Sequence, residues 1–273
     1  MTDFKDVLYL KVSSNVEQTT EMIPPVPQCQ NGGKWSDATE TSCDCTSSFT
    51  GTYCERYWDD CSEGFRMNIL TDGVYTIQPR PYGTPFQVYC KMGFGGRTFV
   101  QKQSSGIDFN RNWQDYTEGF GTPGGDHWLG LEKMKAISDK TPSKFVVRLA
   151  YEKVPTWRQI ICHNVRLSDA VSGFRINFTD TTTAEKEKNQ LIDVVTDLRG
   201  ARFSTYDRDN DENAAGSCAQ THKSGWWFRD CTRCNPNGIL KPIPKEATDP
   251  DVIFWEGDTR GVKETTMYLG GYV

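Results

Sequence analysis

Alternating apolar and polar residues along the first two thirds of the chain predict a series of short β-strands. The predicted strands are VYTI (74–77), FQVYC (86–90), TFVQK (98–102) and FVVRLAY (145–151). In WLGLEKMKAISDK (128–140), the apolar residues Leu131, Met134 and Ile137 recur at helical spacing. This spacing predicts a helix of about two to three turns.

The two ends of the chain have a different texture. Residues 13–28 (SSNVEQTTEMIPPVPQ) are polar and end in three prolines, so residues 1–28 are interpreted as an N-terminal segment and linker. After Tyr206 the periodicity fades and the chain is rich in loop residues, where binding sites tend to lie. The sequence therefore divides into 1–28, a cysteine-rich stretch at 29–55, and a globular domain at 58–273.

Composition narrows the functional classes. The net charge is −5, with no block of like charges, which argues against nucleic-acid binding, and no apolar run is long enough for a membrane helix. Ten cysteines favour an oxidising compartment, so we expect a secreted, extracellular protein. The opening MTDFKDVLYLKV does not have the pattern of a signal peptide, so an export signal would have to be missing or removed. The sequon at Asn177 offers weak support for glycosylation.

The segment CQNGGKWSDATETSCDCTSSFTGTYC (29–54) has four cysteines among small polar residues and is too short to bury a core. It resembles an EGF-like module that has lost one bridge, because CQNGG, the Cys-x-Cys pair and FTG stand in the order of that family. The resemblance implies the pairs Cys29–Cys43 and Cys45–Cys54 and no bound ion. A simple spacer is the alternative role.

From about Asp60 to the end, the chain resembles the fibrinogen C-terminal-like domain. The motifs that carry the resemblance are DCSEG, GVYTIQP, FQVYCKM, FNRNWQDYTEGFG, HWLGLEKM, FSTYDRDND, CAQTHKSGWWFRDC, NPNG and ETTMYL. The resemblance implies an α+β fold with a mixed, largely antiparallel sheet, short helices and a loop-rich C-terminal region for ligand and calcium. It also implies the bridges Cys61–Cys90 and Cys218–Cys231. Cys162 and Cys234 remain: they could pair with each other, or one could bond a second chain in a homo-oligomer.

The stretch YDRDNDENAAGSC (206–218) allows three interpretations: a solvated turn, a catalytic carboxylate cluster or a cation site. It is not an EF-hand, because that loop needs Gly at its sixth position and Glu at its twelfth, where this chain has Glu212 and Cys218. The resemblance implies one Ca²⁺ as cofactor. Its ligands would be the side chains of Asp209 and Asp211 and backbone carbonyls near Asn213 and Ala215. One extra residue before Cys218 could shift the carbonyls to Ala214 or Gly216.

The resemblance also implies a ligand pocket beside this loop, lined by Thr221, His222, Cys231, Thr232, Asn235 and Asp249. A cis peptide at Asp230–Cys231 would turn a backbone N–H into that pocket, where it could bind an acetyl oxygen. Thr232 departs from the family pattern, and no tyrosine stands near Asp249. The pocket's ligand therefore stays open. Trp226 and Trp227 are interpreted as core residues.

No catalytic set is complete. The adjacent Cys162 and His163 would point to opposite faces of a strand, and the Cys231–Cys234 pair lacks a second metal-binding pair. We therefore expect a non-enzymatic, calcium-binding recognition protein. The first hypothesis is lectin-like binding of acetylated sugars or other glycans in innate immune defence. The alternative is a matrix or receptor ligand, similar to tenascin-like and angiopoietin-like proteins, that binds a cell-surface or matrix protein.

Overall fold

The computed structural model describes residues 27–81, 83–139, 143–151, 157–183, 194–195, 197–241, 249–258 and 261–270. All but the last two residues of the predicted linker lie outside these ranges. Among the described residues, no helix is both long and apolar enough to cross a bilayer.

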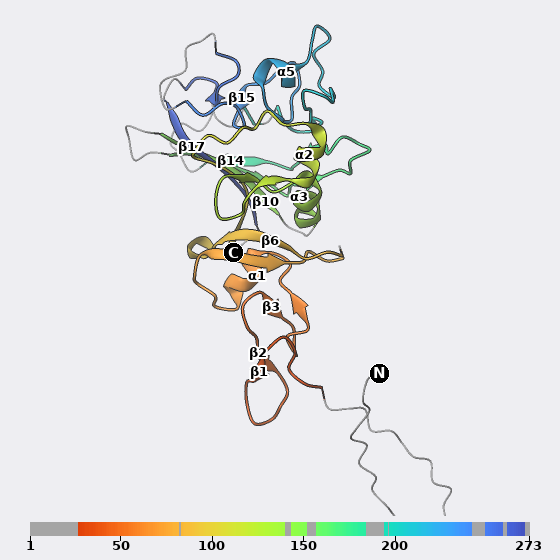
Figure 1. The fold of residues 1–273 in the computed structure, drawn as a ribbon, viewed down its shortest axis with the longest axis vertical. Coiled ribbons are helices and arrows are strands. Elements are labelled where there is room, and N and C mark those ends of the chain that lie inside the picture. Colours follow the sequence, from red (N-terminus) through yellow and green to blue (C-terminus); the bar gives the residue numbers. More distant parts are fainter. Residues whose placement is uncertain are drawn as a thin grey trace, which may run out of the picture.

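A nine-stranded sheet organises the globular part of the chain (Figure 1). Its strands run in the order β14-β11-β10-β17-β7-β6-β5, and a short β8–β9 hairpin pairs with β7. The strand pairings within it are antiparallel, as expected for a largely antiparallel sheet, and one isolated parallel bridge joins Trp58 to Ile77 of β5. The bounds are β5 Gly73–Ile77, β6 Phe86–Lys91, β7 Arg97–Gln103, β8 Phe120–Gly121, β9 His127–Trp128, β10 Lys144–Tyr151, β11 Trp157–His163, β14 Thr181–Thr183 and β17 Val262–Gly270.

The strands that periodicity missed include β11 and also β17, which lies between β10 and β7 at the centre of the sheet. Its side chains are buried from Thr265 to Leu269, including two threonines. The amide of Gln101 on β7 donates to the Thr265 hydroxyl at 2.7 Å. Because polar residues are buried on this central strand, it shows no alternating pattern. The four predicted strands are confirmed as β5, β6, β7 and β10.

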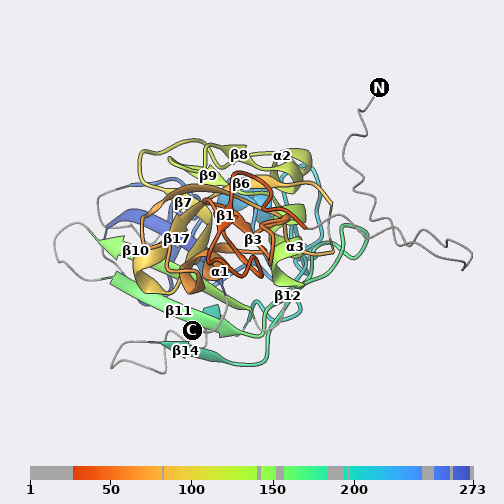
Figure 2. The same ribbon diagram turned by 90° about the horizontal axis from the view of Figure 1, so that it is seen from below.

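Short helices and ribbons surround the sheet (Figures 1 and 2). The predicted helix is confirmed as α3, Leu131–Ser138, with Leu131, Met134 and Ile137 buried. Side chains of Asp60 and Asn112 cap α1 and α2 by accepting from Glu63 N and Asp115 N. The remaining elements are α1 Cys61–Arg66, η1 Met92–Phe94, α2 Trp113–Glu118, α5 Cys218–His222, β12 Arg166–Leu167, β13 Ile176–Asn177, β15 Cys234–Asn235 and β16 Phe254–Trp255.

The four-cysteine segment forms a small separate unit at one end of the molecule (Figure 1). It contains β1 Lys34–Trp35, β2 Cys43–Asp44, β3 Phe49–Thr50 and β4 Arg56–Tyr57. The structure contains both disulfides expected there, Cys29–Cys43 and Cys45–Cys54. The fully buried Trp58 joins this unit to the globular domain, since its indole N–H donates to Phe49 O at 3.0 Å and its ring packs on Gly64.

Candidate ligand and calcium site

The first aspartate of the acidic run, Asp207, has a structural role. Its carboxylate accepts hydrogen bonds from the Thr205 hydroxyl at 2.7 Å and from the backbone N–H of Trp113, the first residue of α2, at 2.9 Å. The next residue, Arg208, lies over the Trp113 ring at 4.0 Å. These contacts tie the start of the loop to α2 and orient Asp207 toward the protein.

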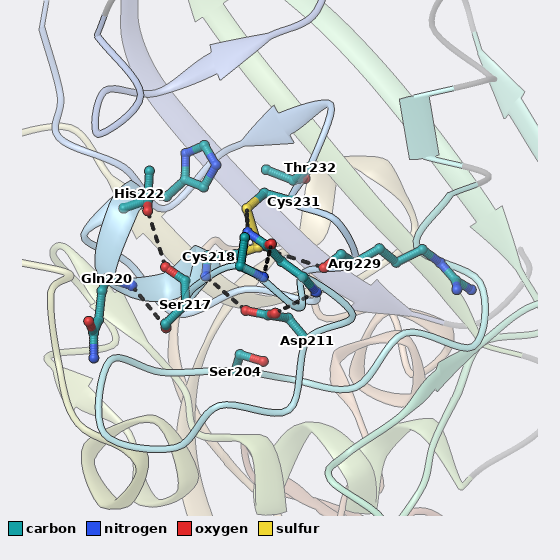
Figure 3. Close-up of a disulfide and its surroundings, with 12 residues drawn as sticks. Ser204, Asp211, Ser217, Cys218, Gln220, His222, Arg229, Cys231 and Thr232 are labelled. Carbon is teal, nitrogen blue, oxygen red and sulfur yellow. Dashed lines mark hydrogen bonds between the residues drawn. A yellow bond between two sulfur atoms is a disulfide. The ribbon is translucent and has the colours of Figure 1, made fainter.

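Asp211 connects the loop to α5 and to the neighbouring disulfide (Figure 3). One carboxylate oxygen accepts from Asn213 N at 2.9 Å, and the other accepts from Cys218 N at 2.8 Å. Burial, followed by the nearby Asp209 carboxylate, raises the pKa of Asp211 despite these hydrogen bonds. Two acidic groups therefore lie close enough to disfavour each other's charge, and a cation between them would relieve that repulsion.

The backbone around these carboxylates suits a hard cation. Within the described part of the chain, the carbonyls of Asn213, Ala215 and Gly216 accept no hydrogen bond. Ca²⁺ is bound by carboxylate and carbonyl oxygens of this kind, completed by water. Among the described residues, no group of three acidic, His or Cys side chains could hold a metal ion. Two carboxylates with free carbonyls fit the predicted ligand set, and calcium binding stays a prediction.

The expected pocket residues Thr221 and His222 lie on α5, which Ser217 caps. Thr221 is exposed and bonds back to Ser217 O at 3.2 Å. His222 is buried, hydrogen-bonded to Pro250 O, and stacked on Phe228 with ring centroids 5.3 Å apart. The imidazole is thus held inside the domain rather than presented to a ligand.

The other expected pocket residues are also bound within the protein. The Thr232 hydroxyl donates to Cys234 O at 2.8 Å, and Lys241 pairs with Asp249 at 3.0 Å. Asn235 is fully buried and bonded to Ser224 and to His222 O. The expected cis peptide at Asp230–Cys231 is wrong, because Arg80–Pro81 is the only cis bond among described residues. Arg229 N instead donates to Cys231 O across this turn at 2.7 Å.

A buried polar network behind this region was missed by sequence reasoning. Asn237 is fully buried: its amide N–H donates to Gly225 O at 2.9 Å, and its carbonyl accepts from Gln101 of β7 at 3.3 Å. The tryptophans Trp226 and Trp227 are confirmed as core residues, both with no exposed surface. The network fixes the segment after the disulfide against the central sheet. The sequence analysis assigned Asn237 no role beyond its place in the NPNG motif.

The cysteines fall into two groups. Cys61–Cys90 and Cys218–Cys231 form the two bridges expected in the globular domain. The tentative Cys162–Cys234 bond is not formed, and both thiols are buried. Cys162 lies on β11 of the central sheet and Cys234 on the β15–β16 ribbon, and the two sulfurs are not bonded to each other. Because both are buried, neither is placed to bond a second chain.

The remaining features considered are His163, the sequon at Asn177 and one cavity. His163 is partly exposed beside the buried Cys162, as expected for neighbours on a strand. Asn177 of the sequon is exposed. A cavity of about 240 Å³ lies away from the acidic loop, between the start of β6, the β8–β9 hairpin and α3.

Comparison with known proteins agrees with this architecture. The family model of the C-terminal globular domain of fibrinogen beta and gamma chains matches residues 57–271. The chain belongs to this family. The four-cysteine segment precedes the matched region, and its assignment as EGF-like stays a prediction.

Similar sequences in this family include bovine angiopoietin-4, 31% identical over 222 residues, which covers 79% of this chain and 43% of that protein. Human fibrinogen-like protein 1 is 31% identical over 229 residues, covering 79% and 72%. The chain therefore spans less than half of the angiopoietins that it matches.

Solved structures of fibrinogen-like domains have a similar fold. The fibrinogen-like globe domain of human ANGPTL2 superposes with a TM-score of 0.71 at 26% identity, covering 78% of this chain and 99% of that one. The corresponding domain of human ANGPTL6 has a TM-score of 0.72 at 23% identity, covering 84% and 100%, which shows the fold alone.

Proposed function

We propose that this chain is a non-catalytic extracellular ligand that uses its fibrinogen-like domain to bind a cell-surface or matrix protein. The observation that carries the proposal is the similarity across most of the chain to angiopoietins and angiopoietin-like globe domains. The four disulfides support an oxidising, extracellular location. The four-cysteine segment, as an EGF-like module, would serve as a spacer.

The contacts around Cys231 favour this hypothesis over acetylated sugars. The trans Asp230–Cys231 bond leaves the family's acetyl-binding geometry unformed, and His222, Thr232 and Asp249 are engaged within the protein. The neighbouring loop instead presents exposed residues, including Tyr206, which is 40% exposed. An exposed aromatic residue on a loop anchored by a disulfide suits a protein interface.

Binding of the labelled chain to intact cells tests the proposal. We expect saturable binding that protease treatment of the cells removes and that free N-acetylated sugars do not displace. Tyr206→Ala should weaken binding, whereas Leu70→Ala, which removes another exposed apolar side chain (59% exposed), should not. Displacement by acetylated sugars with no effect of protease would favour the lectin hypothesis.

We further propose that Ca²⁺ binds at Asp209 and Asp211 and orders the loop. At tenfold excess over its dissociation constant, Ca²⁺ would stabilise the fold by about 1.4 kcal/mol. Thermal unfolding should therefore shift upward with Ca²⁺ and return with chelator. Asp209→Asn should abolish the shift, and the matched Asp207→Asn should retain it because Asp207 is bonded to Thr205 and Trp113. An equal response in both variants would exclude this site.

A further inference from the structure

Three exposed arginines gather on a ribbon beside the acidic loop, whose Asn210 side chain donates to Phe203 O at 2.8 Å. Segments 173–177 and 200–203 run antiparallel, with hydrogen bonds from Ile176 N to Ala201 O at 3.1 Å and from Phe203 N to Gly173 O at 2.9 Å. Phe174, Ile176, Ala201 and Phe203 are buried, whereas Arg175 and Arg202 are exposed on the outward side. Arg202 lies opposite Gly173.

We call Arg175, Arg199 and Arg202 the arginine strip. Hydrogen bonds hold the guanidinium groups of Arg175 and Arg199 in place. Arg175 donates to Gly200 O, between the other two arginines. Arg199 donates to Thr179 O at 2.7 Å and lies over the Phe178 ring at 4.9 Å. The stem of Arg202 lies across Gly173, about 3.3 Å from where a Cβ would stand. Anchored arginines lose less conformational entropy when they bind an anion.

The strip lacks acidic partners. Among described residues, Arg175, Arg199 and Arg202 form no ion pair. Nearby carboxylates are engaged elsewhere. Glu212 of the acidic loop pairs with Arg229 at 2.7 Å, Asp197 pairs with Arg233 at 3.6 Å, and Asp180 accepts from the Thr179 hydroxyl at 3.4 Å. A protein of net charge −5 therefore carries a local group of uncompensated cations.

We propose that the arginine strip binds a sulfated polysaccharide. Guanidinium groups donate two parallel hydrogen bonds to an oxyanion, and sulfate offers the matching oxygens. The strip lies on an exposed ribbon rather than in a pocket, which suits a linear polymer with anions repeated along it. The disulfides place the protein outside the reducing cytosol, where sulfated polysaccharides are the abundant polyanions. The residues of the arginine strip differ from the proposed receptor contact at Tyr206, although both lie in the same region of the domain.

The test measures binding of a size-fractionated heparin oligosaccharide to the full chain at about 0.15 M salt, where exposed charges are screened over about 8 Å. Hyaluronate, which has carboxylates but no sulfates, and polyglutamate are the comparison polyanions. N-glycans are first trimmed with an endoglycosidase, because Asn177 is exposed on the same ribbon.

We expect Arg202→Ala to weaken heparin binding about threefold and Arg175→Ala/Arg202→Ala about tenfold, because charge-assisted pairs are lost. The Arg202 side chain makes no hydrogen bond to the described residues, so its single variant keeps the fold. The control, Lys34→Ala/Lys263→Ala, removes two exposed charges elsewhere and should change binding less than about twofold.

Three results would overturn the proposal. The first is no heparin binding by the unsubstituted protein at this salt concentration. The second is binding by Arg175→Ala/Arg202→Ala as tight as that of the lysine control. The third is polyglutamate or hyaluronate binding as tightly as heparin, which would assign the strip to acidic polymers in general.

Discussion

Removal of one buried hydroxyl, by Tyr116→Phe, should destabilise the globular domain measurably. Tyr116 on α2 has no exposed surface, and its hydroxyl donates to Phe109 O at 2.6 Å and accepts from Gly225 N at 3.0 Å. The ring lies so close to Gly225 that a Cβ there would come within 2.5 Å of it. No water can therefore replace the lost oxygen, and Gly225 N–H would be left without a partner.

The magnitude follows from these two hydrogen bonds. An orphaned buried N–H costs about 1–3 kcal/mol, and the lost bond to Phe109 contributes about 1 kcal/mol more. The cost at Phe109 is small because its carbonyl also accepts from Arg111 N at 2.9 Å. We expect a loss of about 2–4 kcal/mol in the free energy of unfolding.

Urea unfolding followed by tryptophan fluorescence, with the disulfides intact, measures this loss. The control is Tyr75→Phe, whose hydroxyl bonds to Thr71 O at 2.7 Å at an exposed site, so water replaces it and the change should stay within about 0.5 kcal/mol. If the two variants are equally stable, the assigned role of the Tyr116–Gly225 contact is wrong.

Three further predictions follow from burial and hydrogen bonding. Burial raises the pKa of the Cys234 thiol to about 12 and also raises that of Cys162, so neither should react with a thiol reagent until denaturant exposes both; native labelling would contradict their burial. Asp126 is desolvated, but hydrogen bonds from two serines outweigh this and lower its pKa. The stabilisation by the Asp126 carboxylate is therefore fully present above its unfolded pKa, near 4, and is lost as the pH falls through its folded pKa. Asp126→Asn should lower the free energy of unfolding by about 1–3 kcal/mol at neutral pH, and urea titrations at acidic pH should give a smaller difference. Gly64→Ala should cost about 1–3 kcal/mol in the same assay, since its Cβ would meet the Trp58 ring at 2.5 Å; an unchanged midpoint would refute this packing.

Local patterns were sufficient for elements with a strong strand or helix signature. The strands β5, β6, β7 and β10 are rich in β-branched and aromatic residues, and α3 buries Leu131, Met134 and Ile137 at helical spacing, so local patterns predicted them. These patterns missed β17, because that strand is buried at the centre of the sheet and includes buried threonines. Its position depends on hydrogen bonds to β7 and β10, which lie more than 110 residues earlier in the sequence.

The candidate site also contains residues that the sequence indicated and residues whose role only the structure showed. The resemblance to the fibrinogen-like family indicated Asp209 and Asp211 as calcium ligands, and the hydrogen bond from Cys218 N to Asp211 explains how the loop is held on α5. The pocket residues could not be judged from type alone. His222, Thr232 and Asn235 are polar, but each forms hydrogen bonds within the protein, either to residues distant in sequence or within a local turn.

Covalent and local properties of this protein were thus set by its sequence: four disulfides between cysteines at most 29 positions apart, the helix α3 and an acidic loop. The tertiary structure alone decided three matters. It left Cys162 and Cys234 unbonded, buried His222 and Asn235 of the expected pocket, and brought Arg175, Arg199 and Arg202 together on one ribbon. The reason is physical: burial and charge compensation depend on neighbours that only the folded protein brings together.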